Sequence, residues 1–165
     1  MKKQLEYLFL IIIVVALSFI AYNSYESYIF TSSPLPQDYK DKIAQKEQEV
    51  LKNMQDRFGF SYKFPIVITD KIPGRLYGLT SYENGKITIY LNKKVMRESF
   101  DYILSDVIAH EYAHALLFKL HQYQKSAQDD GHSKLWKQTC KALGGKNCQQ
   151  YVDQKEIILS KMPFK

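Results

Sequence analysis

Residues 99–120 read SFDYILSDVIAHEYAHALLFKL, the most regular apolar pattern outside the N-terminal run. Apolar residues recur in it at the spacing of a helical turn: Phe100, Ile103, Leu104, Val107 and Ile108. Such a stripe predicts one long helix from Ser99 to about Lys125, with one face in a hydrophobic core.

Shorter elements surround this helix. Residues 38–58 predict an amphipathic helix that ends at Gly59, and residues 133–143 predict another. Three strands are expected at 65–69, 76–82 and 86–91, and a last helix or strand at 153–159. Asn84-Gly85 joins two of the strands and is typical of a tight hairpin, because both turn positions need positive φ. The pattern predicts an α+β domain, with the long helix packed on a short, three-stranded, mostly antiparallel sheet.

The N-terminus carries an apolar run, Leu8–Tyr22, behind two lysines. A helix counted from Leu5 would be about 27 Å long, close to the bilayer core of about 30 Å. A cleaved signal peptide has a similar pattern, but it needs small residues at the −3 and −1 positions, and Phe19 stands before Ala21. We therefore expect a membrane anchor over residues 1–30, with a signal peptide as the alternative.

Charge around this segment predicts its orientation. Lys2 and Lys3 favour a cytoplasmic N-terminus, and residues 23–37 contain no Lys or Arg. A Pro-containing linker at 31–36 then leads to a soluble domain over 37–165, which we expect outside the cytoplasm, in a periplasm or the extracellular space.

The whole chain is basic, with 23 Lys and Arg against 17 Asp and Glu and a net charge of +6. These basic residues are scattered, without a run of five, which favours a solvated surface over a nucleic-acid patch. We do not expect nucleic acid as a partner.

His110-Glu111-Tyr112-Ala113-His114 forms an H-E-x-x-H pattern on the predicted long helix. Residues four apart differ by about 40° around a helix axis, so both imidazoles can reach one ion. Glu111 lies on the same broad face and can take a proton from a metal-bound water. The pattern predicts a Zn2+ site with His110 and His114 as ligands and Glu111 as the general base.

A catalytic zinc ion usually takes three protein ligands. His121 would lie about 10 Å along the helix axis from His114, too far for the same ion. His132 is better placed, because it follows a polar loop that can fold back. Asp129, Asp130 and Glu156 remain as alternatives.

Two blocks together, DVIAHEYAHALL at 106–117 and GHSKLW at 131–136, resemble the SprT-like zincin-type metallopeptidases. The likeness extends over about residues 47–145 and implies His110, His114 and His132 as zinc ligands, with Glu111 catalytic. Trp136 matches an aromatic residue that follows the third histidine, and we expect it to pack on the motif helix and position His132. The resemblance also implies a small zincin-like fold whose edge strand can pair with an extended peptide. The N-terminal membrane segment departs from the common pattern.

The expected function is that of a membrane-anchored zinc metallopeptidase acting on proteins or peptides. One alternative is a non-catalytic zinc-binding scaffold, which would not need Glu111; another is a cytoplasmic, nucleic-acid-associated protease. Four tyrosines are candidate donors to the oxyanion of the transition state: Tyr82, Tyr112, Tyr123 and Tyr151.

Cys140 and Cys148 are eight positions apart, which matches no zinc-knuckle spacing. They can form a disulfide if the domain lies outside the cytosol. Two free buried thiols are the alternative.

Overall fold

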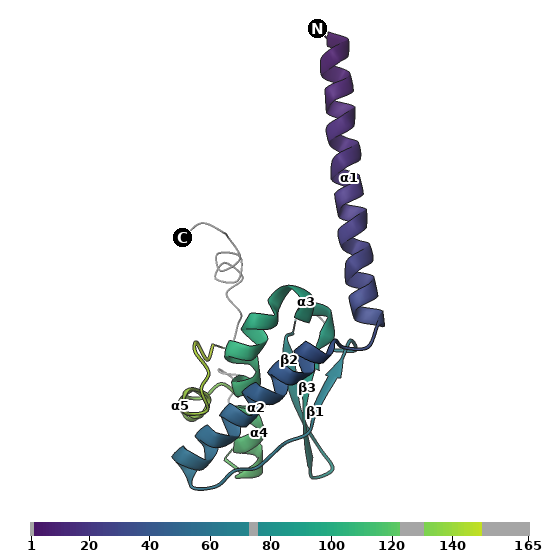
Figure 1. The fold of residues 1–165 in the computed structure, drawn as a ribbon. Helices are drawn as coiled ribbons and strands as arrows, with labels where there is room; N and C mark the ends of the chain where they lie inside the picture. Colours follow the sequence, from purple (N-terminus) through teal and green to yellow (C-terminus); the bar gives the residue numbers. More distant parts are fainter. Residues whose placement is uncertain (1, 73–75, 123–130, 150–165) are drawn as a thin grey trace. The chain divides into compact units, whose positions relative to one another are not determined.

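The computed structural model describes residues 2–72, 76–122 and 131–149 (Figure 1). The chain divides into two compact units, Met1–Leu35 and Pro36–Lys165. The segment 153–159, for which a helix or strand is expected, lies outside the described residues.

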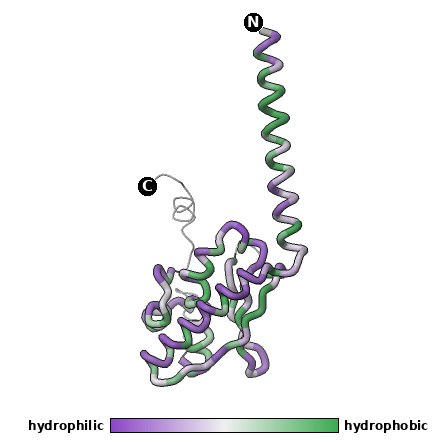
Figure 2. The backbone as a smooth tube through the Cα atoms, viewed as in Figure 1, coloured by the Kyte–Doolittle hydropathy of each residue, from purple (hydrophilic) through white to green (hydrophobic). Residues whose placement is uncertain are grey.

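The first unit contains one helix, α1, over Lys2–Ser32. Figure 2 shows hydrophobic residues running along much of it, and the large apolar side chains between Leu5 and Ile20 are exposed. The candidate span Lys3–Ser32 has a mean hydropathy of 2.4 in its most apolar part, and none of that part is buried. This helix is long and apolar enough to cross a bilayer, and a signal sequence would share these properties.

The second unit contains a three-stranded sheet with the strand order β1-β3-β2. The strands are β1 (Ile66–Thr69), β2 (Gly78–Glu83) and β3 (Lys86–Asn92). The expected hairpin is present: β2 and β3 are antiparallel, and Asn84 and Gly85 have φ of 51° and 76°. Because β1 joins the other side of β3 in parallel, the sheet is mixed. The expected α+β class is confirmed.

The second unit also contains helical segments. They are α2 (Gln37–Phe58), α3 (Lys93–Tyr102), a π-helical turn η1 (Ile103–Val107), α4 (Ile108–Lys119) and α5 (Lys134–Ala142). Of these, α4 makes the main contacts with the sheet. α2 ends at Gly59, which has φ of 77°, as its sequence predicts.

The prediction of one helix from Ser99 to about Lys125 was wrong at both ends. Helical structure begins at Lys93, because the Asn92 side chain accepts a hydrogen bond from the backbone N–H of Lys94 and caps the first turn. Ser99 then interrupts it with φ of −132°. α4 ends at Lys119, and His121 has φ of 54°, in the left-handed region.

α4 is the central element of the second unit. It contacts β2 and β3, and it also packs against α2 and α5. Nine of its residues are therefore buried, among them Glu111 and His114. This burial places the polar groups of the motif inside the domain, where they need hydrogen-bond partners or a metal ion.

Candidate metal centre and active site

Three histidines meet beside α4. His110 and His114 lie on that helix, and His132 stands two residues before α5. The Nε2 atom of His132 is 3.2 Å from the Nε2 atoms of both His110 and His114. Two nitrogens that bind one tetrahedral ion at about 2.0–2.1 Å lie about 3.3 Å apart, so this spacing fits a shared metal ion.

The approach to His132 depends on a turn and on a helix cap. Gly131 has φ of 90°, a left-handed conformation that glycine adopts without strain. On the other side, the Ser133 side chain accepts a hydrogen bond from the backbone N–H of Trp136 and caps α5. These two features fix the chain on both sides of His132.

The imidazoles on α4 are kept neutral. Burial, and then the charge of His132, lower the pKa of His110 to about 3. Burial, followed by the charges of His110 and His132, lowers the pKa of His114 to about 2. Neutral imidazole is the form that binds metals, so the site is ready for an ion near neutral pH.

Trp136 contacts all three histidines. Its ring centroid is 4.6 Å from that of His110, 5.2 Å from that of His114 and 4.4 Å from that of His132. The side chain is only 1% exposed. Trp136 therefore packs on the motif helix and against His132, as expected.

Glu111 turns towards β2. The Thr80 hydroxyl lies 2.7 Å from Glu111 Oε2 and 3.0 Å from the Glu111 carbonyl oxygen. Burial raises the pKa of the Glu111 carboxyl to about 7, while hydrogen bonds from the side chain and backbone of Thr80 act in the opposite direction. A carboxyl group with this pKa suits general-base chemistry near neutral pH.

Gly78 gives Glu111 the room to lie there. A Cβ atom at position 78 would lie 2.8 Å from Glu111 Oε1 and 2.9 Å from both Glu111 Cγ and Val107 Cγ1. Sequence reasoning missed Gly78 and Thr80. Strand alternation places the two residues on one face, but nothing in the sequence shows that this face meets Glu111.

Of the remaining candidate ligands, only His121 lies in the described part of the chain, and it does not join the three histidines. His121 follows the end of α4 and is not part of the metal-binding group. Asp129, Asp130 and Glu156 lie outside the described residues.

Among the candidate oxyanion donors, Tyr112 is excluded. Its hydroxyl is buried and donates to Glu47 Oε1 at 2.7 Å, and burial and Glu47 raise its pKa. The Tyr82 ring stacks on Phe118 of α4 with the ring centroids 5.7 Å apart, and the residue is 49% exposed. Tyr123 and Tyr151 lie outside the described residues.

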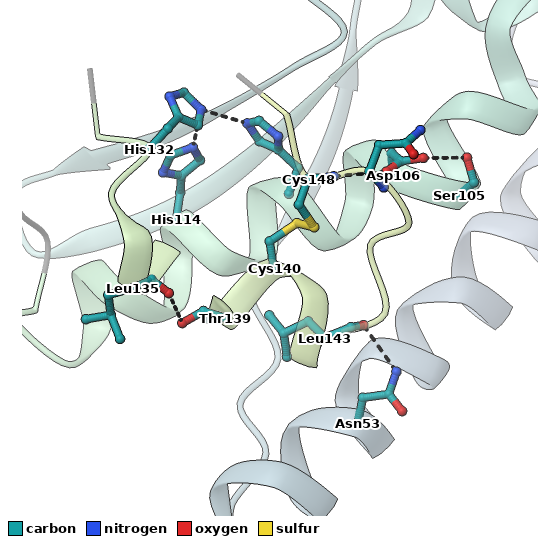
Figure 3. The surroundings of a disulfide bond; sticks show 12 residues. Asn53, Ser105, Asp106, His114, His132, Leu135, Thr139, Cys140, Leu143 and Cys148 are labelled. Atoms are coloured by element: carbon teal, nitrogen blue, oxygen red, sulfur yellow. Dashed lines mark hydrogen bonds between the residues drawn. A yellow bond between two sulfur atoms is a disulfide. The ribbon is translucent and has the colours of Figure 1, made fainter. Parts of the chain in front are cut away.

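A disulfide joins Cys140 of α5 to Cys148, close to His114 and His132 (Figure 3). The loop that it closes is tied to η1, because Asp106 Oδ1 accepts backbone N–H bonds from Asn147 at 2.6 Å and from Cys148 at 3.4 Å. The alternative of two free thiols is therefore set aside. The bridge and Asp106 together hold α5 beside the helix that carries His110.

The comparisons with known proteins agree with this geometry. The model of the SprT-like family matches residues 39–156, a range that contains the three histidines and Glu111. The chain matches no curated protein. Since the family model covers most of the sequence, the chain belongs to the SprT-like family.

Proposed function

We propose that this chain is a membrane-anchored zinc metallopeptidase that hydrolyses peptide bonds in proteins or peptides. The observation that carries the proposal is the meeting of three imidazole nitrogens beside a buried carboxyl group. Three nitrogen ligands with an open fourth position are typical of catalytic zinc, whereas structural zinc usually takes four protein ligands.

His110, His114 and His132 would hold the ion. Zinc at this position would polarise the scissile carbonyl and lower the pKa of a bound water towards 7. Glu111 would take a proton from the attacking water and pass it to the departing amine nitrogen. Trp136 and other buried side chains of α4 and α5 exclude bulk water from one side of the histidines, and this strengthens electrostatic interactions there.

The position of β2 supports a peptide substrate. β2 lies at one edge of the sheet and against α4, and its outer edge pairs with no strand in the described part of the chain. An extended peptide can add to such an edge through main-chain hydrogen bonds. Leu79 and Tyr82 are 42% and 49% exposed on this strand and offer apolar contacts to substrate side chains.

The placement outside the cytoplasm is supported by two independent features. The α1 helix follows Lys2 and Lys3, which favours a cytoplasmic N-terminus. The Cys140–Cys148 disulfide favours an oxidising compartment for the second unit. The same disulfide argues against a cytoplasmic, nucleic-acid-associated protease.

The test compares the purified full-length chain in detergent with its Glu111→Gln variant. We expect both to bind about one zinc ion, and only the wild type to cleave casein, with a loss in the variant of at least about a hundredfold. His132→Ala should lose zinc as well as activity. If wild type and Glu111→Gln bind zinc and are equally inert, the chain is a zinc-binding scaffold. A reporter fused to the C-terminus would identify the side of the membrane.

A further inference from the structure

The contact between β2 and the Glu111 side chain is made by the Thr80 hydroxyl. This hydroxyl donates to Glu111 Oε2 at 2.7 Å and also lies 3.0 Å from the Glu111 carbonyl oxygen. Thr80 thus links β2 directly to the Glu111 carboxyl group.

The register of the sheet explains why the Thr80 backbone is available. Thr80 pairs with Ile89 of β3. The N–H of Ile89 donates to Pro65 on the β1 side, at 2.9 Å. Because the N–H and C=O groups of one strand residue point to the same side, the Thr80–Ile89 pair exchanges no hydrogen bonds. Thr80 therefore directs its own N–H to the outer edge of β2, away from β3.

The Glu111 side chain is also confined by packing contacts near Gly78. The missing Cβ of Gly78 leaves a space that Glu111 fills, and Val107 lines the same space. Glu111 is 5% exposed, so little solvent is available to replace a lost hydrogen bond. A buried carboxyl group that loses a donor is expected to move or to change rotamer.

We propose that Thr80 is a positioning residue that fixes the Glu111 carboxyl group in the orientation needed for proton transfer. The proposal rests on the proposed function of Glu111 as general base. A base must lie within about 2.6–3.2 Å of the proton that it takes, and a displacement of about 1 Å can cost a hundredfold in rate. Since a hydroxyl both donates and accepts, Thr80 can stay bonded whether or not the carboxyl group carries a proton.

The experiment uses the zinc-loaded full-length chain in detergent with three variants. Thr80→Val removes the hydroxyl and keeps the shape, and Thr80→Ser keeps the hydroxyl. Thr88→Val is the matched control, because Thr88 pairs with Ser81 and lies on the face of the sheet turned away from Glu111. Kinetics with a quenched peptide, zinc content and the melting temperature are measured for each.

We expect Thr80→Val to lower kcat by about tenfold to a hundredfold, with KM within about threefold of the wild type and zinc content unchanged. Thr80→Ser should keep kcat within about threefold, and Thr88→Val should match the wild type. In a Glu111→Gln background, Thr80→Val should cause no further loss, because the group that Thr80 positions is no longer a base.

Crystal structures of the variants provide a readout other than activity. In Thr80→Val we expect the Glu111 carboxyl group to leave its position beside β2 or to occupy two rotamers, whereas Thr80→Ser should keep the contact near 2.7 Å. An unmoved Glu111 in Thr80→Val, wild-type kcat in that variant, or an equal loss in Thr80→Ser would each overturn the proposal. If instead the wild type shows no Glu111-dependent cleavage, the proposed function fails first, which is a distinguishable result.

Discussion

Replacing Gly78 with alanine should weaken both the fold and the activity, although alanine is the smallest change possible there. Gly78 begins β2 without a left-handed φ, so alanine suits its backbone. In such a position glycine to alanine normally stabilises a protein by about 0.4–1 kcal/mol, because the unfolded chain loses entropy. The contacts of the new methyl group instead predict a loss of stability.

The structure gives the size of the effect. The added Cβ would lie 2.9 Å from Glu111 Cγ and from Val107 Cγ1. Carbon atoms ordinarily pack at about 3.5–4.0 Å, so each neighbour must retreat by about 0.6 Å. Overpacking of this kind costs about 1–3 kcal/mol. After the entropic gain, we expect the free energy of unfolding to fall by about 1–2 kcal/mol.

Activity should fall further than stability suggests. The same movement pushes Glu111 away from β2 and lengthens its bonds to Thr80, and misplacement of a catalytic group by about 1 Å can cost a hundredfold. For Gly78→Ala we therefore expect kcat to fall by about tenfold or more. Zinc content should be unchanged, because the three histidines lie on α4 and before α5.

Denaturant unfolding of the full-length chain tests the predicted fall in the free energy of unfolding, and peptide-cleavage kinetics test the predicted fall in kcat. Ser81→Ala is the matched control, since Ser81 belongs to the same strand and faces away from α4. A Gly78→Ala variant that is as stable and as active as the wild type would show that β2 and α4 are not in such close contact at Glu111 and Val107.

Other parts of the domain yield separate predictions. Reduction of the Cys140–Cys148 bridge, whose sequence separation is 8, should lower the free energy of unfolding by about 2.5 kcal/mol, as thermal unfolding with and without dithiothreitol will show. Tyr112→Phe removes the buried bond to Glu47 and should cost about 1–3 kcal/mol in chemical denaturation while kcat stays near the wild-type value; a large loss of kcat alone would restore Tyr112 as a catalytic donor. Trp136 is the one tryptophan of the chain and contacts the three histidines. Removal of zinc with a chelator should therefore change the tryptophan fluorescence, and added zinc should restore it. An unaltered spectrum would indicate that zinc does not bind at these histidines.

Local patterns predicted the parts of the site that depend on neighbours in sequence. His110 and His114 are one helical turn apart, so their shared direction follows from helix geometry alone. Asn84-Gly85 likewise specifies its own turn and hence the hairpin. His132 was favoured because a polar loop precedes it, and the structure places its Nε2 atom 3.2 Å from both other imidazoles.

Features set by tertiary contacts were not predictable in this way. The early start of α3 depends on Asn92, which ends a strand and caps a helix at once. The π-helical turn η1 contains Asp106, whose carboxylate binds the backbone of the loop that the disulfide closes. Thr80 and Gly78 read only as strand residues, because their partner Glu111 is about thirty positions away in sequence.

The two chemical tasks of the site rest on different elements, which makes them separable. The three histidines proposed as metal ligands each contact Trp136 of α5, and the disulfide holds α5 in turn. Glu111, the proposed general base, contacts Thr80 and Gly78 of β2. Substitutions in α5 should therefore lower zinc affinity before they alter the position of Glu111. Substitutions in β2 should lower kcat while zinc stays bound. Loss of a histidine, including His132 outside α4, should remove zinc and activity together, whereas changes at Thr80 or Gly78 should leave zinc bound.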